Sequence, residues 1–133
     1  DVAHPAPGVV GAIEAADTVI IGPSNPPLSI WPILAVDAIS AAVRSHPRVI
    51  AVSPLIGGKT LRGPAAMVLA DLGLGQGTPG VVASYRGLID TLIVDSSDVV
   101  DVGNVDGVSV VAMDTLISRQ VEAERLARGI LQL

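Results

Sequence analysis

The sequence predicts an α/β protein with a mainly parallel sheet. Short runs rich in Val, Ile and Leu alternate with longer stretches of helical periodicity. The runs carry few charges, which is typical of strands buried on both faces. The 14 glycines and 10 prolines lie between the runs, where they indicate structured turns. Because Trp31 and Tyr85 are the only aromatic residues, the core is expected to consist of Val, Ile, Leu and Ala.

Composition excludes several classes of protein. Half of the 133 residues are apolar and 16% are charged, which excludes a disordered chain. No apolar run approaches the ~20 residues of a membrane span, and no signal peptide is recognisable, so we expect a soluble, cytoplasmic, single-domain protein. The absence of cysteine excludes disulfides, iron–sulfur clusters and thiolate zinc sites. The net charge of −5, with a single lysine, argues against binding to nucleic acid.

Strands and helices are expected to alternate along the chain. Strands are expected at residues 18–21, 49–53, 91–94 and 108–112. Helices are expected at residues 9–16, from 29 to near 44–46, and at 64–72, 79–85 and 118–131. Ser29 is expected to be the N-cap of the second helix. In such a sheet, ligands bind beyond the carboxyl ends of the parallel strands.

The loop at residues 22–29 joins the first strand to a helix. A helix N-terminus with polar side chains beside it can bind an anion, so this loop is a candidate phosphate site; a turn stiffened by prolines, with an ordinary serine cap, is the alternative. The residues predicted to bind phosphate are Gly22, Pro23, Ser24, Asn25 and Ser29. Trp31 follows, and it either covers a ring-shaped ligand or simply packs in the core.

The loop at residues 54–63 follows the second strand. Gly57 and Gly58 allow a ligand to approach the backbone closely, and are predicted to bind phosphate. Lys59 and Arg62 can neutralise a phosphate or carboxylate, and are the predicted catalytic cations. A solvent-exposed loop that carries solubilising charge is the alternative.

Four carboxylates follow or flank the third strand. They are Asp90, Asp95, Asp98 and Asp101. Clustered carboxylates can hold Mg²⁺. An acidic surface turn is the other interpretation, so the sequence assigns no metal ligands.

Three longer segments together resemble the 2-phospho-L-lactate transferase family. They are residues 16–30 (ADTVIIGPSNPPLSI), 32–36 (PILAV) and 53–64 (SPLIGGKTLRGP). Shorter segments at residues 83–85, 88–90 and 95–98 fit the same family. The resemblance covers nearly all of this chain but only the C-terminal portion of the family's proteins. It implies a Rossmann-like three-layer fold, incomplete in this chain, with residues 1–133 as the C-terminal part of one domain.

The resemblance also implies a function. Members of this family take 2-phospholactate or phosphoenolpyruvate from a guanosine-pyrophosphoryl donor and transfer it, with Mg²⁺, to the deazaflavin FO. The products are GMP and a precursor of coenzyme F-420. The resemblance thus implies an enzyme that binds a GDP-type nucleotide, and we expect a homodimer, with this fragment inactive by itself.

Two alternatives remain open at this point. Relatives of the same fold bind a UDP-sugar and act as regulators without transferring a group. A structural or interaction fragment without activity is the other alternative.

Overall fold

A mainly parallel sheet forms the centre of the fold, as predicted. The computed structural model describes residues 3–60, 63–101 and 103–133. Its five-stranded sheet has the order β1-β2-β5-β7-β6. The four parallel strands are β1 (Val19–Ile21), β2 (Val49–Val52), β5 (Thr91–Asp95) and β7 (Val108–Met113). The short strand β6 (Gly103–Val105) runs antiparallel to β7 at one edge.

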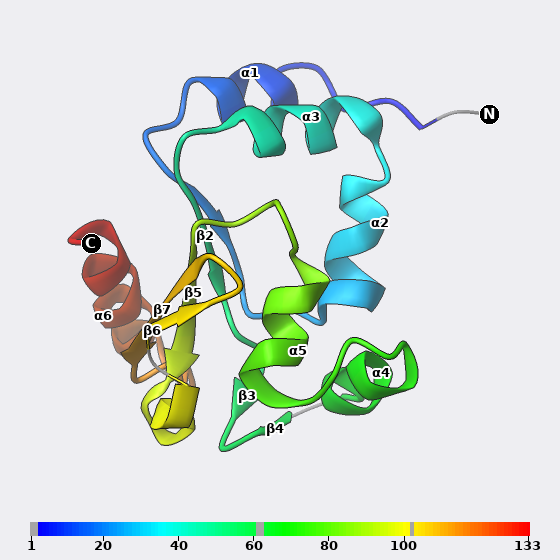
Figure 1. Cartoon of the computed structure of the whole chain (residues 1–133). Coiled ribbons are helices and arrows are strands. Elements are labelled where there is room, and N and C mark those ends of the chain that lie inside the picture. Colours follow the sequence, from blue (N-terminus) through cyan, green and yellow to red (C-terminus); the bar gives the residue numbers. More distant parts are fainter. Residues whose placement is uncertain (1–2, 61–62, 102) are drawn as a thin grey trace.

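Both faces of this sheet are covered by helices, which gives three layers (Figure 1). Helix α6 (Gln120–Leu131) lies on one side of the sheet. The other side carries α1 (Val9–Glu14), α2 (Trp31–Leu34), α3 (Asp37–Ser45), α4 (Ala65–Asp71) and α5 (Gly77–Ser84). The arrangement confirms the expected three-layer α/β fold.

The side chains of β2 show why the sequences of the strands are uninterrupted apolar runs. Successive side chains of a strand point to opposite faces. Val49 and Ala51 pack in the larger core, beneath α1 to α5. Ile50 and Val52 pack in the smaller core, against α6. All four residues are buried, so no position in β2 requires a polar side chain.

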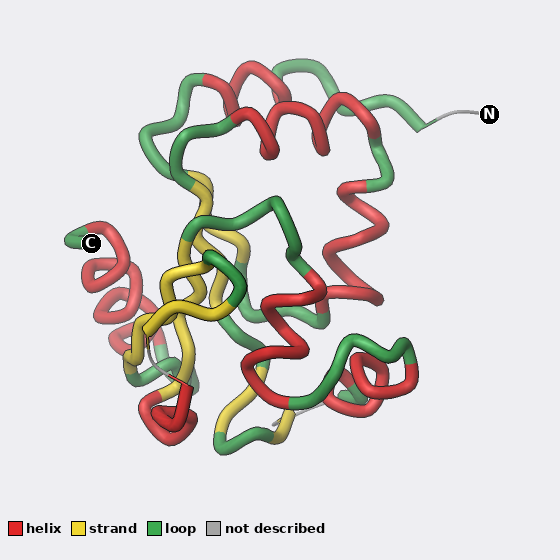
Figure 2. Tube along the Cα trace, in the orientation of Figure 1, coloured by secondary structure: helices red, strands yellow, loops and turns green. Residues whose placement is uncertain are grey.

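The prediction of a single helix from Ser29 to near residues 44–46 is wrong. The chain instead forms a π-helical turn, η1 (Pro26–Ile30), which continues into α2 and then bends by 98° into α3. Figure 2 shows this change of direction between two helical segments. The cap is Asn25, whose Oδ1 accepts the Leu28 N–H at 3.2 Å, so Ser29 lies inside the first turn. The break falls at Val36, whose backbone is extended.

Three short elements were not predicted. A hairpin of β3 (Leu55–Ile56) and β4 (Lys59–Thr60) replaces the expected open loop. Its two-residue turn, Gly57-Gly58, has φ values of 60° and 71°, a left-handed conformation that glycine adopts without strain. A 3₁₀ helix, η2 (Ser96–Asp101), follows β5, and β6 pairs with β7.

No single helix in the described ranges is both long and apolar enough to cross a membrane. The bent pair formed by Pro26–Leu34 and Asp37–Ser45 meets the length and composition criteria only when its two halves are taken together.

Candidate functional site

A cavity of about 620 Å³ lies at the carboxyl edge of the parallel sheet. Its walls come from the loop after β1, the loop after β2, the β3–β4 hairpin, the start of α4 and residues 115–118 after β7. The carboxyl ends of parallel strands meet at one edge of a sheet, which explains why segments so distant in sequence converge here. This cavity is the candidate site.

Asn25 lines this cavity and carries a hydrogen-bond donor that has no partner among the described residues. Its Oδ1 caps the helix through the Leu28 N–H, which fixes the orientation of the amide. Its Nδ2 is buried and has no hydrogen-bond partner among the described residues. A buried donor without a partner costs about 1–3 kcal/mol. An oxygen of a bound ligand would satisfy it.

The other predictions for the first loop have mixed outcomes. Pro23 lines the cavity together with Asn25. Three predicted residues do not line it: Gly22, Ser24 and Ser29. The backbone N–H of Ser24 donates to the carbonyl of Gly22, and that of Ser29 donates to the carbonyl of Asn25. The loop therefore uses part of the donor set that was expected to bind an anion, and phosphate binding here stays a prediction.

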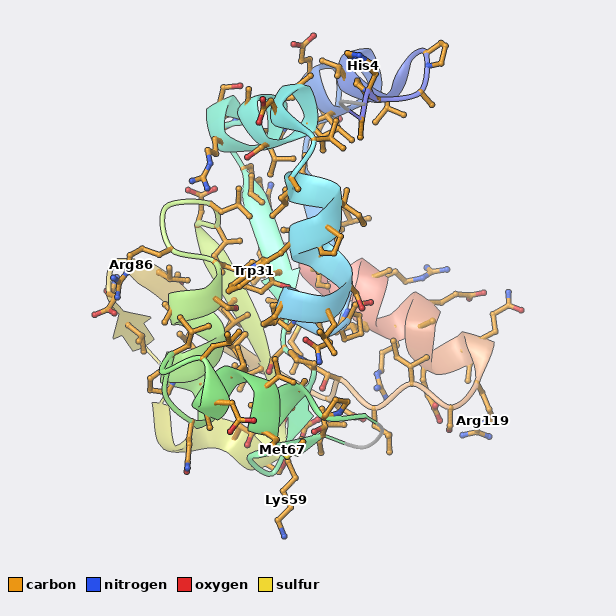
Figure 3. The ribbon with its side chains drawn as sticks, turned by 90° about the vertical axis from the view of Figure 1, so that its right-hand side faces the viewer. His4, Trp31, Lys59, Met67, Arg86 and Arg119 are labelled. Carbon is orange, nitrogen blue, oxygen red and sulfur yellow. The ribbon has the colours of Figure 1, made fainter. Side chains whose placement is uncertain are left out.

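In the second loop, Gly57 and Gly58 form the turn of the hairpin, and neither lines the cavity. The Gly58 N–H donates to Asp98 Oδ1 at 2.5 Å. This amide therefore already has an acceptor and is not free to bind a phosphate. Lys59 is exposed, and its side chain points away from the rest of the molecule (Figure 3). Thr60, the next residue, lines the cavity. This geometry favours the solvent-exposed alternative for Lys59, and Arg62 lies outside the described residues.

Two of the four carboxylates, Asp90 and Asp95, lie at opposite ends of β5. Asp90 precedes β5 and accepts the Val49 N–H at 2.8 Å, whereas Asp95 ends the same strand. The side chain of Asp101 is not among those described. Within the described ranges, no group of three or more His, Asp or Glu residues could hold a metal ion. The ligands of Mg²⁺ therefore stay unassigned.

Asp95 is a buried carboxylate that joins two loops at the sheet edge. Its Oδ1 accepts hydrogen bonds from the backbone N–H (2.9 Å) and the hydroxyl (2.6 Å) of Ser97. Its Oδ2 accepts hydrogen bonds from the backbone N–H (3.1 Å) and the hydroxyl (3.2 Å) of Thr115. Burial raises the pKa of Asp95, but these hydrogen bonds outweigh burial and lower the pKa below its ordinary value of 3.8.

Residues 115–118 form a wall of the cavity that sequence reasoning missed. Thr115 is buried, whereas Leu116 and Ile117 are 46% and 44% exposed although they line the cavity. The segment carries no recognisable motif. Its signal is only positional, because it follows the fourth parallel strand and so must reach the same sheet edge.

Glu122 fixes the far end of this wall. Its Oε2 accepts hydrogen bonds from the Ser118 N–H at 2.6 Å and the Ser118 hydroxyl at 2.8 Å. The Arg119 guanidinium contacts Oε1 at 2.9 Å. Hydrogen bonds from Ser118 and then Arg119 lower the pKa of Glu122 to about 2.

Trp31 does not lie at the candidate site. Its indole N–H donates to the Ser84 carbonyl at 2.9 Å, and Figure 3 shows the ring between α2 and α5. It lines a separate cavity of about 380 Å³, formed by α2, α3 and the end of α5. The packing interpretation of Trp31 is favoured over that of a lid on a ligand.

Comparison with known proteins identifies the family. The family model described as 2-phospho-L-lactate transferase CofD matches residues 1–129. The chain belongs to the 2-phospho-L-lactate transferase family. The resemblance drawn from the two loops is therefore confirmed.

Individual relatives of this family are similar over nearly the whole chain. A 2-phospho-L-lactate transferase of Methanopyrus kandleri is 41% identical over 98% of the chain and 42% of its own length. One from Methanococcus vannielii is 33% identical over 98% of the chain and 41% of its own length. A phosphoenolpyruvate transferase of Kitasatospora aureofaciens is 40% identical over 100% of the chain and 43% of its own length.

These identities and coverages have two consequences for the assignment to the transferase family. The chain spans less than half the length of the curated relatives it matches. A relative named for phosphoenolpyruvate is about as similar as one named for phospholactate, at 40% against 41% identity. Overall identity therefore does not separate the two acids.

Proposed function

We propose that the protein containing this chain transfers a 2-phospholactyl or phosphoenolpyruvyl group from a guanosine-pyrophosphoryl donor to the deazaflavin FO, in coenzyme F-420 biosynthesis. Family membership supports the reaction class. The observation that carries the proposal to this part of the chain is the cavity at the sheet edge, which is lined by Asn25, a residue whose Nδ2 has no partner among the described residues.

The proposed reaction is a displacement at phosphorus. A ribityl hydroxyl oxygen of FO attacks the phosphorus that carries the three-carbon acid, and a new phosphodiester bond forms. The phosphoanhydride bond to GMP breaks, its electron pair remains on GMP, and the hydroxyl proton passes to water. Such transfers require mainly positioning and charge stabilisation from the protein.

The described residues supply positioning. Asn25 Nδ2 donates to an oxygen of the donor pyrophosphate, and the hydroxyl of Thr60 on the hairpin wall offers a further hydrogen bond. The described lining carries no charged side chain. Neutralisation of the phosphate charge by Arg62 stays a prediction, and the exposed position of Lys59 argues against its sharing that role.

Mg²⁺ is proposed from the family resemblance alone, and a homodimer is proposed because apolar faces left by the missing half would need a partner to cover them. Because the described residues do not form a metal-binding group, we assign no step of the reaction to the metal. When bound, Mg²⁺ would neutralise phosphate charge.

The UDP-sugar regulator is the less favoured alternative, because the relatives reported above are named transferases. The two functions differ in their ligands. The complete protein, incubated with FO, Mg²⁺ and the guanylylated acid, is expected to release one GMP for each phospho-acid transferred. Tight binding of a UDP-sugar without any release of GMP would instead support the regulator.

A further inference from the structure

Leu116 and Ile117 form an exposed apolar wall in a cavity whose lining is mixed, with polar and apolar side chains. Both side chains line the cavity and remain nearly half exposed. Pairs of aliphatic side chains beside convergent polar groups are typical of small-molecule sites, where the apolar part of the ligand covers them. An apolar part of a ligand would cover this wall, and in the proposed substrates the flat aromatic rings are such parts.

The position of this apolar wall depends on one contact at its base. Thr115 immediately precedes Leu116, and both its backbone N–H and its hydroxyl donate to Asp95 Oδ2. Asp95 is 7% exposed and belongs to the end of β5, a strand at the centre of the sheet. The wall is thus attached to the central strand of the sheet, while Asp95 itself does not line the cavity.

Only an ionised carboxylate suits this place. Four donors converge on Asp95, two on each oxygen, so both oxygens must accept hydrogen bonds. An asparagine offers one acceptor oxygen, and its NH₂ group would face donors on the other side. An Asp95→Asn variant therefore keeps the size of the side chain, but its NH₂ group meets the donors of either Ser97 or Thr115, so Thr115→Val is tested beside it.

We propose that Asp95 is a positioning residue, which holds the apolar wall in place through Thr115 for the flat aromatic ring of a substrate. The inference rests on the proposed function. The ring comes either from the deazaflavin acceptor or from the guanine of the donor. Asp95 acts on it only through Thr115, without touching the substrate.

The test compares Asp95→Asn with Ser97→Ala in the complete protein. Ser97 contacts the other oxygen of Asp95 and does not line the cavity, so Ser97→Ala leaves the bonds to Thr115 in place. Asp95→Asn is expected to raise the KM of the ring-bearing substrate about tenfold and to change kcat less than about threefold. Ser97→Ala is expected to change both constants by less than about threefold.

The outcomes identify the ring or overturn the inference. A raised KM for FO assigns the wall to the acceptor, and a raised KM for the guanosine donor assigns it to guanine. Unchanged KM values for both substrates in Asp95→Asn and in Thr115→Val would overturn the inference. Were Asp95→Asn unable to fold, Thr115→Val should raise the same KM, and Thr115→Ser, which keeps the hydroxyl, should restore it.

Amide hydrogen exchange provides a readout that does not depend on activity. Exchange at residues 115–118 is expected to accelerate in Asp95→Asn relative to the parent and to Ser97→Ala. If the parent releases no GMP, the proposed function fails, while exchange still decides whether Asp95 holds the wall. Equal exchange in all three proteins would contradict the positioning role.

Discussion

Asp98 holds the β3–β4 hairpin against η2, because its Oδ1 accepts the backbone N–H of Gly58 at 2.5 Å. The hairpin carries Ile56 and Thr60 into the cavity, so this contact sets the position of one wall. Asp98 Oδ2 is buried and has no partner among the described residues.

Asp98→Ala removes the acceptor for the exposed Gly58 N–H and is expected to lower the free energy of unfolding by about 0.5–1.5 kcal/mol, the usual net contribution of one hydrogen bond. Asp98→Asn keeps an acceptor oxygen and is expected to be nearly neutral. Urea denaturation of both variants checks the pair. Equal loss of stability in the two would show that the charge, and not the hydrogen bond to Gly58, matters.

The pH dependence of stability should report the ionisation of Asp95. The pKa of Asp95 is lowered in the folded state, so the group stabilises the fold above its ordinary pKa of 3.8. That contribution is lost as the pH falls through the lower, folded-state pKa. Asp95→Asn should therefore be less stable than the parent by about 1.5–3 kcal/mol near neutral pH. The difference should shrink in acid below about pH 4, and a gap that stays constant over this range would contradict the assignment.

Gly80 is expected to tolerate no side chain. A Cβ at Gly80 would lie 2.6 Å from the carbonyl oxygen of Gly75, which belongs to the backbone and cannot move aside easily. Gly80→Ala should therefore cost about 1–3 kcal/mol of stability. Gly11→Ala is the matched control, because nothing lies within 4 Å of that position in α1, and it should stabilise by about 0.5–1 kcal/mol. Thermal unfolding of the two variants should show shifts of opposite sign.

Lys59→Met tests which interpretation of the second loop holds. A catalytic cation would lower turnover far more than it weakens substrate binding, since charge develops mainly in the transition state. The outward direction of Lys59 predicts instead that kcat and KM change by less than about threefold (Figure 3). A fall in kcat of about a hundredfold, with KM unchanged, would restore the catalytic role.

The strands and most helices could be predicted from sequence because strands buried on both faces need uninterrupted apolar runs. The bend between α2 and α3 could not. The stripe Pro32, Val36, Ile39 and Val43 fits one continuous helix, and periodicity does not reveal that the backbone of Val36 is extended. The hairpin was readable in principle, since Gly57-Gly58 between two short runs is a common turn signal.

The candidate site was predicted in part. Asn25 and Pro23 follow a strand and precede a helix, a position that directs attention to them. Thr115 and Asp95 belong to no motif, and their importance arises from a contact between segments twenty residues apart in sequence. The Asp95-Ser96-Ser97 segment did contain a local signal, because aspartate often accepts the N–H two residues later.

The most direct test of the account is the rate of GMP release by Asn25→Asp in the complete protein. This variant keeps an oxygen that accepts the Leu28 N–H and caps the helix. It replaces the unpartnered NH₂ group of a residue that lines the cavity by a negatively charged oxygen. Ser24→Ala, at an exposed residue outside the cavity lining, is the control. Initial rates at low donor concentration should give a kcat/KM at least about tenfold below the parent for Asn25→Asp, and within about threefold of it for Ser24→Ala. A parent that releases GMP, together with an Asn25→Asp variant that releases it equally fast, would contradict the claim that this cavity holds the donor.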